Sequence, residues 1–252
     1  GMLRYEHAND AMVIKTANTE QLRIKSDGNI IIGSGGSWSY PKALNVQGSS
    51  GSILSLYNAD TTTYAANTTS AIEFKLLTGN TGNQSGSCEI RAFKENGTNG
   101  NNARALSFYT GGNGGSPSEK LRISSEGYVT KPNQPSFHVS RRGGNVSANN
   151  YVVFDQVFHN NGNHYNNSNG RFTAPVTGVY FFSAWNYIGG TSAFQLRINT
   201  STYAEYTWDD TGGCGTWVCP MTAGQYAQIY TRYYGWRGTA DYHNGFNGFL
   251  IG

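Results

Sequence analysis

The chain has little of what a nucleic-acid-binding or disulfide-stabilised protein requires. Its 252 residues include only 3 cysteines, an odd number that does not suggest a disulfide framework. Charged residues make up 13% of the chain, and their formal net charge is only +3. No run or stripe of cations is visible that would displace phosphate counterions. We therefore expect no nucleic-acid partner.

Long apolar runs are also missing. The run from Gly178 to Ser183 is among the longest, far below the about 20 residues of a membrane-spanning helix. The residues from Met2 to His7 lack the apolar core of a signal peptide. The sequence therefore predicts no membrane insertion and no export signal in this stretch.

What the chain does have is many short segments rich in aromatic and β-branched residues. Aromatic residues make up 13% of the chain, and 33 glycines help to separate the segments. Such residues favour strands, whereas glycine, asparagine and serine between them favour turns. The sequence therefore predicts an all-β protein.

A change in composition near Lys131-Pro132-Asn133-Gln134-Pro135 divides the chain. Of its 34 aromatic residues (17 Tyr, 12 Phe and 5 Trp), 24 lie after this point, where lysine no longer occurs. Two prolines three residues apart disfavour a helix and suit an extended linker. We predict one β-rich domain at residues 1–131 and a second domain at residues 132–252.

The first domain contains a repeat. Glu20-Gln21-Leu22-Arg23-Ile24-Lys25-Ser26-Asp27-Gly28-Asn29-Ile30 recurs as Glu119-Lys120-Leu121-Arg122-Ile123-Ser124-Ser125-Glu126-Gly127-Tyr128-Val129. In each copy, Leu-Arg-Ile alternates with the period of a strand, and the following acidic residue and glycine suit a hairpin turn. Between the copies we expect further strands at 43–46, 53–57, 71–75, 89–93 and 105–109.

Each of these strands offers only two or three apolar side chains. At about 25 cal/mol per Å² of buried apolar surface, one copy can hardly enclose a core. Three chains wound together would pool these side chains. With its Leu-Arg-Ile hairpins, this domain resembles the shafts of tail fibres from tailed phages, over roughly residues 15 to 131.

The second domain resembles the C1q-like family. The resemblance rests on Asn160-Asn161-Gly162-Asn163-His164-Tyr165, Gly170-Arg171-Phe172-Thr173-Ala174-Pro175-Val176 and Gly178-Val179-Tyr180-Phe181-Phe182-Ser183. It continues through Met221 to Tyr226 and Asn247 to Ile251. It implies a ten-stranded jelly-roll sandwich that forms a homotrimer about a threefold axis. Aromatic residues would help fill the interface, with Tyr187, Tyr206, Tyr226 and Tyr230 as candidates.

Individual segments of this domain carry more specific expectations. We predict one strand at 151–158, and a strand buried on both faces at 180–182. Phe246, Phe249 and Ile251 should complete the core. Cys214 and Cys219, five residues apart, fit either two buried thiols or a bridge.

Two loops hold the polar and aromatic residues left after the core is assigned. Flat aromatic faces beside carboxylate and guanidinium groups suit sugar recognition. Alternatively, the two tryptophans pack under the loops or in the trimer interface. The candidate ligand-binding residues are Trp208, Asp209, Asp210, Tyr233, Tyr234, Trp236, Arg237, Asp241 and Tyr242.

No cofactor or metal centre is predicted, although Asp209 and Asp210 leave a Ca²⁺ site open as an alternative. We find no motif for a nucleophile, and no carboxylate pair stands out. The resemblances together imply a non-enzymatic, homotrimeric tail-fibre protein of a virion that binds a host polysaccharide or protein receptor. Other tail or fibre proteins would be its partners. The alternatives are a structural clamp that sets the register of a fibre, or a polysaccharide depolymerase.

Overall fold

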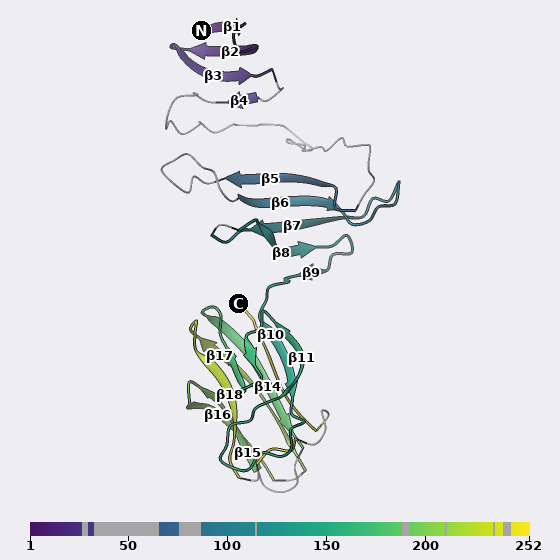
Figure 1. The fold of residues 1–252 in the computed structure, drawn as a ribbon, viewed down its shortest axis with the longest axis vertical. Helices are drawn as coiled ribbons and strands as arrows, with labels where there is room; N and C mark the ends of the chain where they lie inside the picture. Colours follow the sequence, from purple (N-terminus) through teal and green to yellow (C-terminus); the bar gives the residue numbers. More distant parts are fainter. Residues whose placement is uncertain are drawn as a thin grey trace, which may run out of the picture. The chain divides into compact units, whose positions relative to one another are not determined.

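The computed structural model describes residues 1–26, 30–32, 66–75, 87–113, 115–187, 192–209, 211–233, 235–238 and 243–252. The chain divides into two compact units, Gly1–Ala59 and Asp60–Gly252. The predicted boundary at 131/132 lies inside the second unit, between two separate sheets. All described elements are strands, as Figure 1 shows, which confirms the all-β prediction.

The described residues of the first unit form an antiparallel sheet, which we call the N-terminal sheet. Its order is β1-β2-β3-β4, from β1 (Met2–Glu6), β2 (Ala11–Thr16), β3 (Thr19–Ile24) and β4 (Ile30–Ile32). The first copy of the repeat forms the hairpin β3–β4, in which Ile24 pairs with Ile30. Its predicted turn at 27–28 and the strands expected at 43–46 and 53–57 lie outside the described residues.

The second unit begins with a further antiparallel sheet, the middle sheet, in the order β5-β6-β7-β8-β9. Its strands are β5 (Thr69–Lys75), β6 (Ser87–Lys94), β7 (Arg104–Thr110), β8 (Ser118–Ile123) and β9 (Val129–Thr130). The strands expected at 71–75, 89–93 and 105–109 are therefore confirmed. The second copy of the repeat forms the hairpin β8–β9, with Gly127 at φ +86° in its turn, where glycine is favoured.

Ten strands form the C-terminal sandwich (Figure 1). One sheet has the order β11-β10-β19-β14-β17, from β11 (Gln156–Asn161), β10 (Ser136–Ser140), β19 (Asn244–Leu250), β14 (Gly178–Asn186) and β17 (Gly213–Met221). The other has the order β12-β13-β18-β15-β16, from β12 (Tyr165–Asn166), β13 (Arg171–Thr173), β18 (Tyr226–Thr231), β15 (Ser192–Ile198) and β16 (Ser201–Trp208). The last strand lies beside the first in a central position, as the jelly-roll resemblance implies.

The sandwich core is aromatic. Phe137 has its ring centroid 4.9 Å from those of Phe172 and Phe246, and Phe154, Tyr180 and Phe182 are fully buried around them. The alternation predicted for residues 194–199 is confirmed, because Phe194 and Leu196 are fully buried and Ile198 packs against the core. The core therefore sits between the two sheets of the sandwich.

Three expectations for the sandwich are wrong. Phe249 and Ile251 are exposed, because Phe246 already faces inward and residues three or five positions further along a strand point to the opposite face. Phe181 lies on that same outer face, opposite Phe249, so β14 is buried on one face only. The strand expected at 151–158 begins only at Gln156, although Val152 and Phe154 ahead of it are fully buried.

Two further points concern chemistry and membranes. Cys88, Cys214 and Cys219 are all free, and Cys219 is buried while Cys214 is exposed. Of the two thiols expected to be buried, only that of Cys219 is, and no bridge joins Cys214 to Cys219. Burial raises the pKa of the Cys219 thiol to about 11.

Within the described ranges, no helix is long and apolar enough to cross a membrane.

Candidate functional site

The signature turn around Asn160 has a structural role. The Asn160 side-chain carbonyl accepts from the Tyr165 N–H at 3.0 Å, and its amide donates to the Tyr165 carbonyl at 2.8 Å. Gly162 takes φ +78° in the turn between them. The buried Tyr165 hydroxyl contacts the backbone N–H and carbonyl of Phe154 at 3.1 and 3.2 Å. The motif thus fixes the loop that carries Phe154 into the core.

One sheet of the sandwich carries no charged residue. The five strands β11, β10, β19, β14 and β17 contain no Asp, Glu, Lys or Arg along their lengths. We call it the charge-free sheet. Its inner face covers the core, whereas its outer face exposes apolar side chains from four strands, namely Phe158, Val179, Val218 and Phe249.

The apolar side chains of this outer face form two clusters. Phe181 pairs with both Val218 and Phe249 across the strands, and the Phe181 and Phe249 ring centroids are 5.1 Å apart. Towards the other end of the face, the His138 ring lies 5.0 Å from Phe158 and 5.8 Å from Trp185. Exposed apolar clusters of this kind are typical of interaction surfaces.

The second sandwich sheet differs, because its outer aromatic residues are covered by arginines. The Arg197 guanidinium carbon lies 3.4 Å from the Tyr230 ring centroid, and that of Arg171 lies 4.0 Å from the Tyr226 ring centroid. Arg232 pairs with Glu205 at 3.2 Å. This sheet therefore presents a solvated, charged face.

The two loops predicted to bind a ligand meet beside the end of β14. The Asn186 side-chain carbonyl accepts from the Arg237 N–H at 3.0 Å, and its amide donates to the Gly235 carbonyl at 3.4 Å. Gly212 in the other loop packs against the backbone of Asn186 and Tyr187. The Tyr187 ring stacks on His243 at 5.3 Å, with the Arg237 guanidinium carbon 5.4 Å from its centroid. Sequence reasoning did not identify Asn186 as the residue that joins the loops.

The tryptophans of those predicted loops lie inside the protein. The segment from Tyr203 to Trp208, predicted as part of a loop, belongs to strand β16. Trp236 is fully buried, with its ring edge-on to Phe154 at 5.4 Å and to Phe194 at 5.2 Å. Trp208 is 8% exposed and packs edge-on against Phe194. Neither indole presents a face to a ligand, which agrees with the alternative that they pack under the loops.

The remaining candidates divide into two groups. Asp209, Tyr233 and Arg237 are described, and Tyr233 is 53% exposed, so their ligand-binding role stays a prediction. Asp210, Tyr234, Asp241 and Tyr242 lie outside the described residues, and with them half of the alternative Ca²⁺ site. Among the residues that the structure does describe, no group of three or more His, Cys, Asp or Glu side chains is placed to hold a metal.

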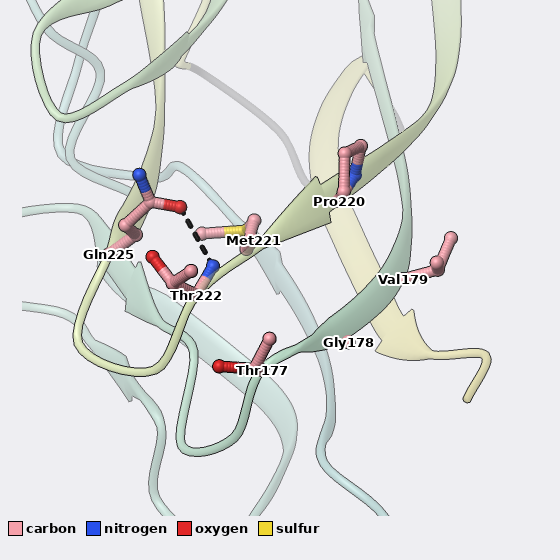
Figure 2. A pocket seen from close by; sticks show the side chains of 7 residues that line it. All are labelled: Thr177, Gly178, Val179, Pro220, Met221, Thr222 and Gln225. Atoms are coloured by element: carbon pink, nitrogen blue, oxygen red, sulfur yellow. Dashed lines mark hydrogen bonds between the residues drawn. The ribbon is translucent and has the colours of Figure 1, made fainter.

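A cavity of about 350 Å³ lies where β14 begins and β17 ends. Figure 2 shows its lining residues, which are Thr177, Gly178, Val179, Pro220, Met221, Thr222 and Gln225. The Gln225 side-chain carbonyl accepts from the Thr222 N–H at 2.8 Å, which closes the turn before β18. None of the lining side chains is ionisable, so the cavity has no general acid or base. Its rim residues Val179 and Pro220 pair on the charge-free sheet.

The fold and this face define a jelly-roll β-sandwich with one apolar sheet surface. Residues 136–213 match the family described as C1q domain, so the C1q part of the sequence prediction is confirmed for that segment. Among curated proteins, the rat complement C1q tumor necrosis factor-related protein 6 is 43% identical over 58 residues, which are 21% of this chain and 22% of the relative. The mouse protein of the same name is 41% identical with the same coverage. The chain thus spans about a fifth of these relatives.

Among solved structures, the globular domain of zebrafish complement 1qA is 21% identical, with a TM-score of 0.40. The match covers 47% of this chain and 98% of that domain. Murine APRIL is 9% identical, with a TM-score of 0.39 and coverage of 47% and 99%.

The relatives overturn the viral part of the sequence interpretation. They are mammalian proteins named for complement C1q and tumor necrosis factor, not components of a bacterial virus. The predicted tail-fibre function, receptor attachment to a bacterial host and location in a virion are therefore wrong. The Leu-Arg-Ile hairpins on which that resemblance rested are short, and their physical pattern suits any exposed antiparallel sheet.

Proposed function

We propose that residues 132–252 form a non-catalytic module that holds three copies of the chain together through the charge-free sheet. The module carries the N-terminal sheet and the middle sheet, which precede it in the chain. The number three rests on the likeness of the sequence to C1q-like modules. The supporting observation is the outer face of Phe158, Val179, Phe181, Val218 and Phe249, which has no charged side chain among its strands.

The composition of this face favours a protein interface. Interface cores are enriched in aromatic residues and depleted of charge, whereas a face that stays in water gains solubility from charge. The second sandwich sheet supplies the comparison within the same module, since its outer aromatics lie under arginines. The proposal therefore leaves Tyr206, Tyr226 and Tyr230, which belong to that second sheet, outside the interface.

A substitution on the face tests the proposal. Val218, 56% exposed on β17, becomes charged in Val218→Asp, and three buried carboxylates without partners would oppose assembly. Sedimentation of the intact chain should then show a single-chain mass in place of the assembled mass. Thr207→Asp, at an exposed position of β16 in the second sheet, is the matched control and should keep the assembled mass. An assembled mass for Val218→Asp would count against the charge-free sheet as the interface.

A further inference from the structure

The middle sheet has one apolar face that is open to solvent. The register places Ile72, Ile90, Phe108 and Leu121 in one row across β5, β6, β7 and β8. A parallel row holds Ala92, Leu106, Ile123 and Val129, and Phe74 pairs with Cys88 at the edge. Phe74 is 52% exposed, and Ile72, Leu106, Phe108 and Val129 are exposed as well. We call this surface the open apolar face.

The opposite face of the same sheet is covered by its own side chains. Glu89 pairs with Arg91 at 2.5 Å, and the Arg91 guanidinium carbon lies 4.0 Å from the Tyr109 ring centroid. Arg122 lies over Phe93 in the same way, at 4.3 Å, so that Phe93 is buried without a second layer. The charges of Glu89, Arg91 and Arg122 thus lie on one face, where they are paired, whereas the two apolar rows on the other face contain no charged side chain. Lys94 and Arg104 stand on that other face beyond the rows, where β6 ends and β7 begins.

The N-terminal sheet, taken by itself, repeats this arrangement. Leu3, Ile14 and Leu22 share one row, and Tyr5, Met12, Ile24 and Ile30 share the next. Five of these, Leu3, Met12, Ile14, Ile24 and Ile30, are exposed apolar side chains. On the other face Arg23 pairs with Glu20 at 2.7 Å and with Glu6 at 3.1 Å.

We propose that the open apolar faces of both sheets are interfaces with the same faces of other copies of this chain. An amphipathic sheet must bury its apolar face against another layer to be stable. Here the same pattern recurs in two separate sheets, so the partner must offer two matching apolar faces in the same order along its sequence. Another copy of this chain has both faces in that order, because its sequence is the same.

The connection to the sandwich strengthens this choice of partner. Only five residues, 131–135, separate the end of β9 from the start of β10. Fully extended, such a linker reaches roughly 20 Å. Once the sandwiches assemble, the middle sheets of the copies are held at a high effective concentration, which favours contact between them. In this respect the inference rests on the proposed function.

The cysteines provide a test with the intact chain. Cys88 lies on the open apolar face, opposite Phe74, and is exposed in the single chain. In a Cys214→Ser background, Cys88 is the remaining exposed thiol, while the buried Cys219 reports whether the sandwich stays folded. We expect a water-soluble thiol reagent to modify Cys88 about tenfold more slowly in the assembly than after unfolding, because reaction requires local opening.

Neighbouring substitutions separate the two faces. Ile72→Asp places a carboxylate on the open apolar face, whereas Ala71→Asp places one on the opposite face, beside Arg91. Ile72→Asp should restore fast modification of Cys88 while Cys219 stays protected and the mass stays trimeric. Ala71→Asp should leave Cys88 slow.

The outcomes distinguish this inference from the proposed function. A trimer whose Cys88 reacts slowly in the parent chain and fast in Ile72→Asp supports the inference. A trimer whose Cys88 reacts as fast as the unfolded thiol overturns the inference and leaves the proposed function standing. A single-chain mass overturns both, and slow Cys88 in such a monomer would mean that the face is covered from within one chain.

Discussion

The Glu119 carboxylate accepts hydrogen bonds from the Nε and Nη2 atoms of Arg122 at 2.9 and 2.7 Å, although the two residues are three apart in one strand. In a regular strand such residues point to opposite faces. The register skips Lys120, since Tyr109 pairs with Glu119 and Phe108 with Leu121, and this bulge returns both side chains to one face. The N-terminal sheet skips Gln21 and joins Glu20 to Arg23 in the same way.

This pair predicts a local effect of charge. Hydrogen bonding to Arg122 holds the pKa of Glu119 below its ordinary value of 4.5, so the pair stabilises the folded sheet above that pH. The contribution is lost as the pH falls through the lowered pKa. Glu119→Gln should cost about 1 kcal/mol at neutral pH, seen as faster hydrogen exchange in β7 and β8. Glu126→Gln, in the exposed turn, removes the same charge and should leave the exchange unchanged.

Removal of the Tyr165 hydroxyl should lower the stability of the sandwich without changing its fold. Tyr165→Phe keeps the ring stacked 5.2 Å from Phe137 but leaves the buried Phe154 N–H and carbonyl without their hydroxyl partner. Unsatisfied buried groups of this kind cost about 1–3 kcal/mol each. Denaturant unfolding of the sandwich should show a reduced free energy of unfolding of at least the lower figure. An unchanged midpoint would mean that the hydroxyl contributes nothing to the fold.

Substitution of Trp236 should lower the stability of the sandwich, because its side chain belongs to the core. Trp236→Ala should destabilise the sandwich by about 3–5 kcal/mol, because it empties a fully buried site between Phe154 and Phe194. Tyr233→Ala in the same loop removes an exposed side chain and should change the unfolding free energy by less than about 0.5 kcal/mol. Equal stability of the two variants would contradict the burial of Trp236.

Of the two histidines on the charge-free sheet, His138 is expected to give the stability a pH dependence. Burial, and secondarily the neighbouring His159, lowers the pKa of His138 below its ordinary value of 6.5. The unfolded chain therefore binds a proton more readily, and the free energy of unfolding should fall as the pH drops below 6.5 towards the lowered pKa. His138→Gln should reduce this dependence in denaturant titrations at several pH values. His7→Gln, in the N-terminal sheet, should retain it.

Much of the fold was predictable because its determinants are local in sequence. Alternation of apolar and polar residues identified β5, β6, β7 and β15, and the repeat identified both hairpins. The orientation of Phe249 could not be predicted, because an aromatic residue near the end of the chain suits the core and an interface equally well. The register with Phe181 decides between them, and that pairing joins residues 68 positions apart.

The candidate site was predictable only in part for a related reason. The glycine-rich surroundings of Trp208 and Trp236 predict loops, yet Trp208 ends strand β16 and both side chains turn inward. Phe194, on the strand β15 that pairs with β16, is a packing partner for each. The five strands that lack charged residues are separate segments of the sequence between residues 136 and 250. Their shared surface became recognisable only once the strand order placed them side by side.

The solution mass of the intact chain is the direct test of assembly through the charge-free sheet. Light scattering after size-exclusion chromatography at neutral pH should give about 82 kDa, three times the 27.4 kDa of one chain. A mass of 27.4 kDa that persists at high protein concentration would rule out this assembly, because the apolar outer face of Phe181, Val218 and Phe249 would then remain in water.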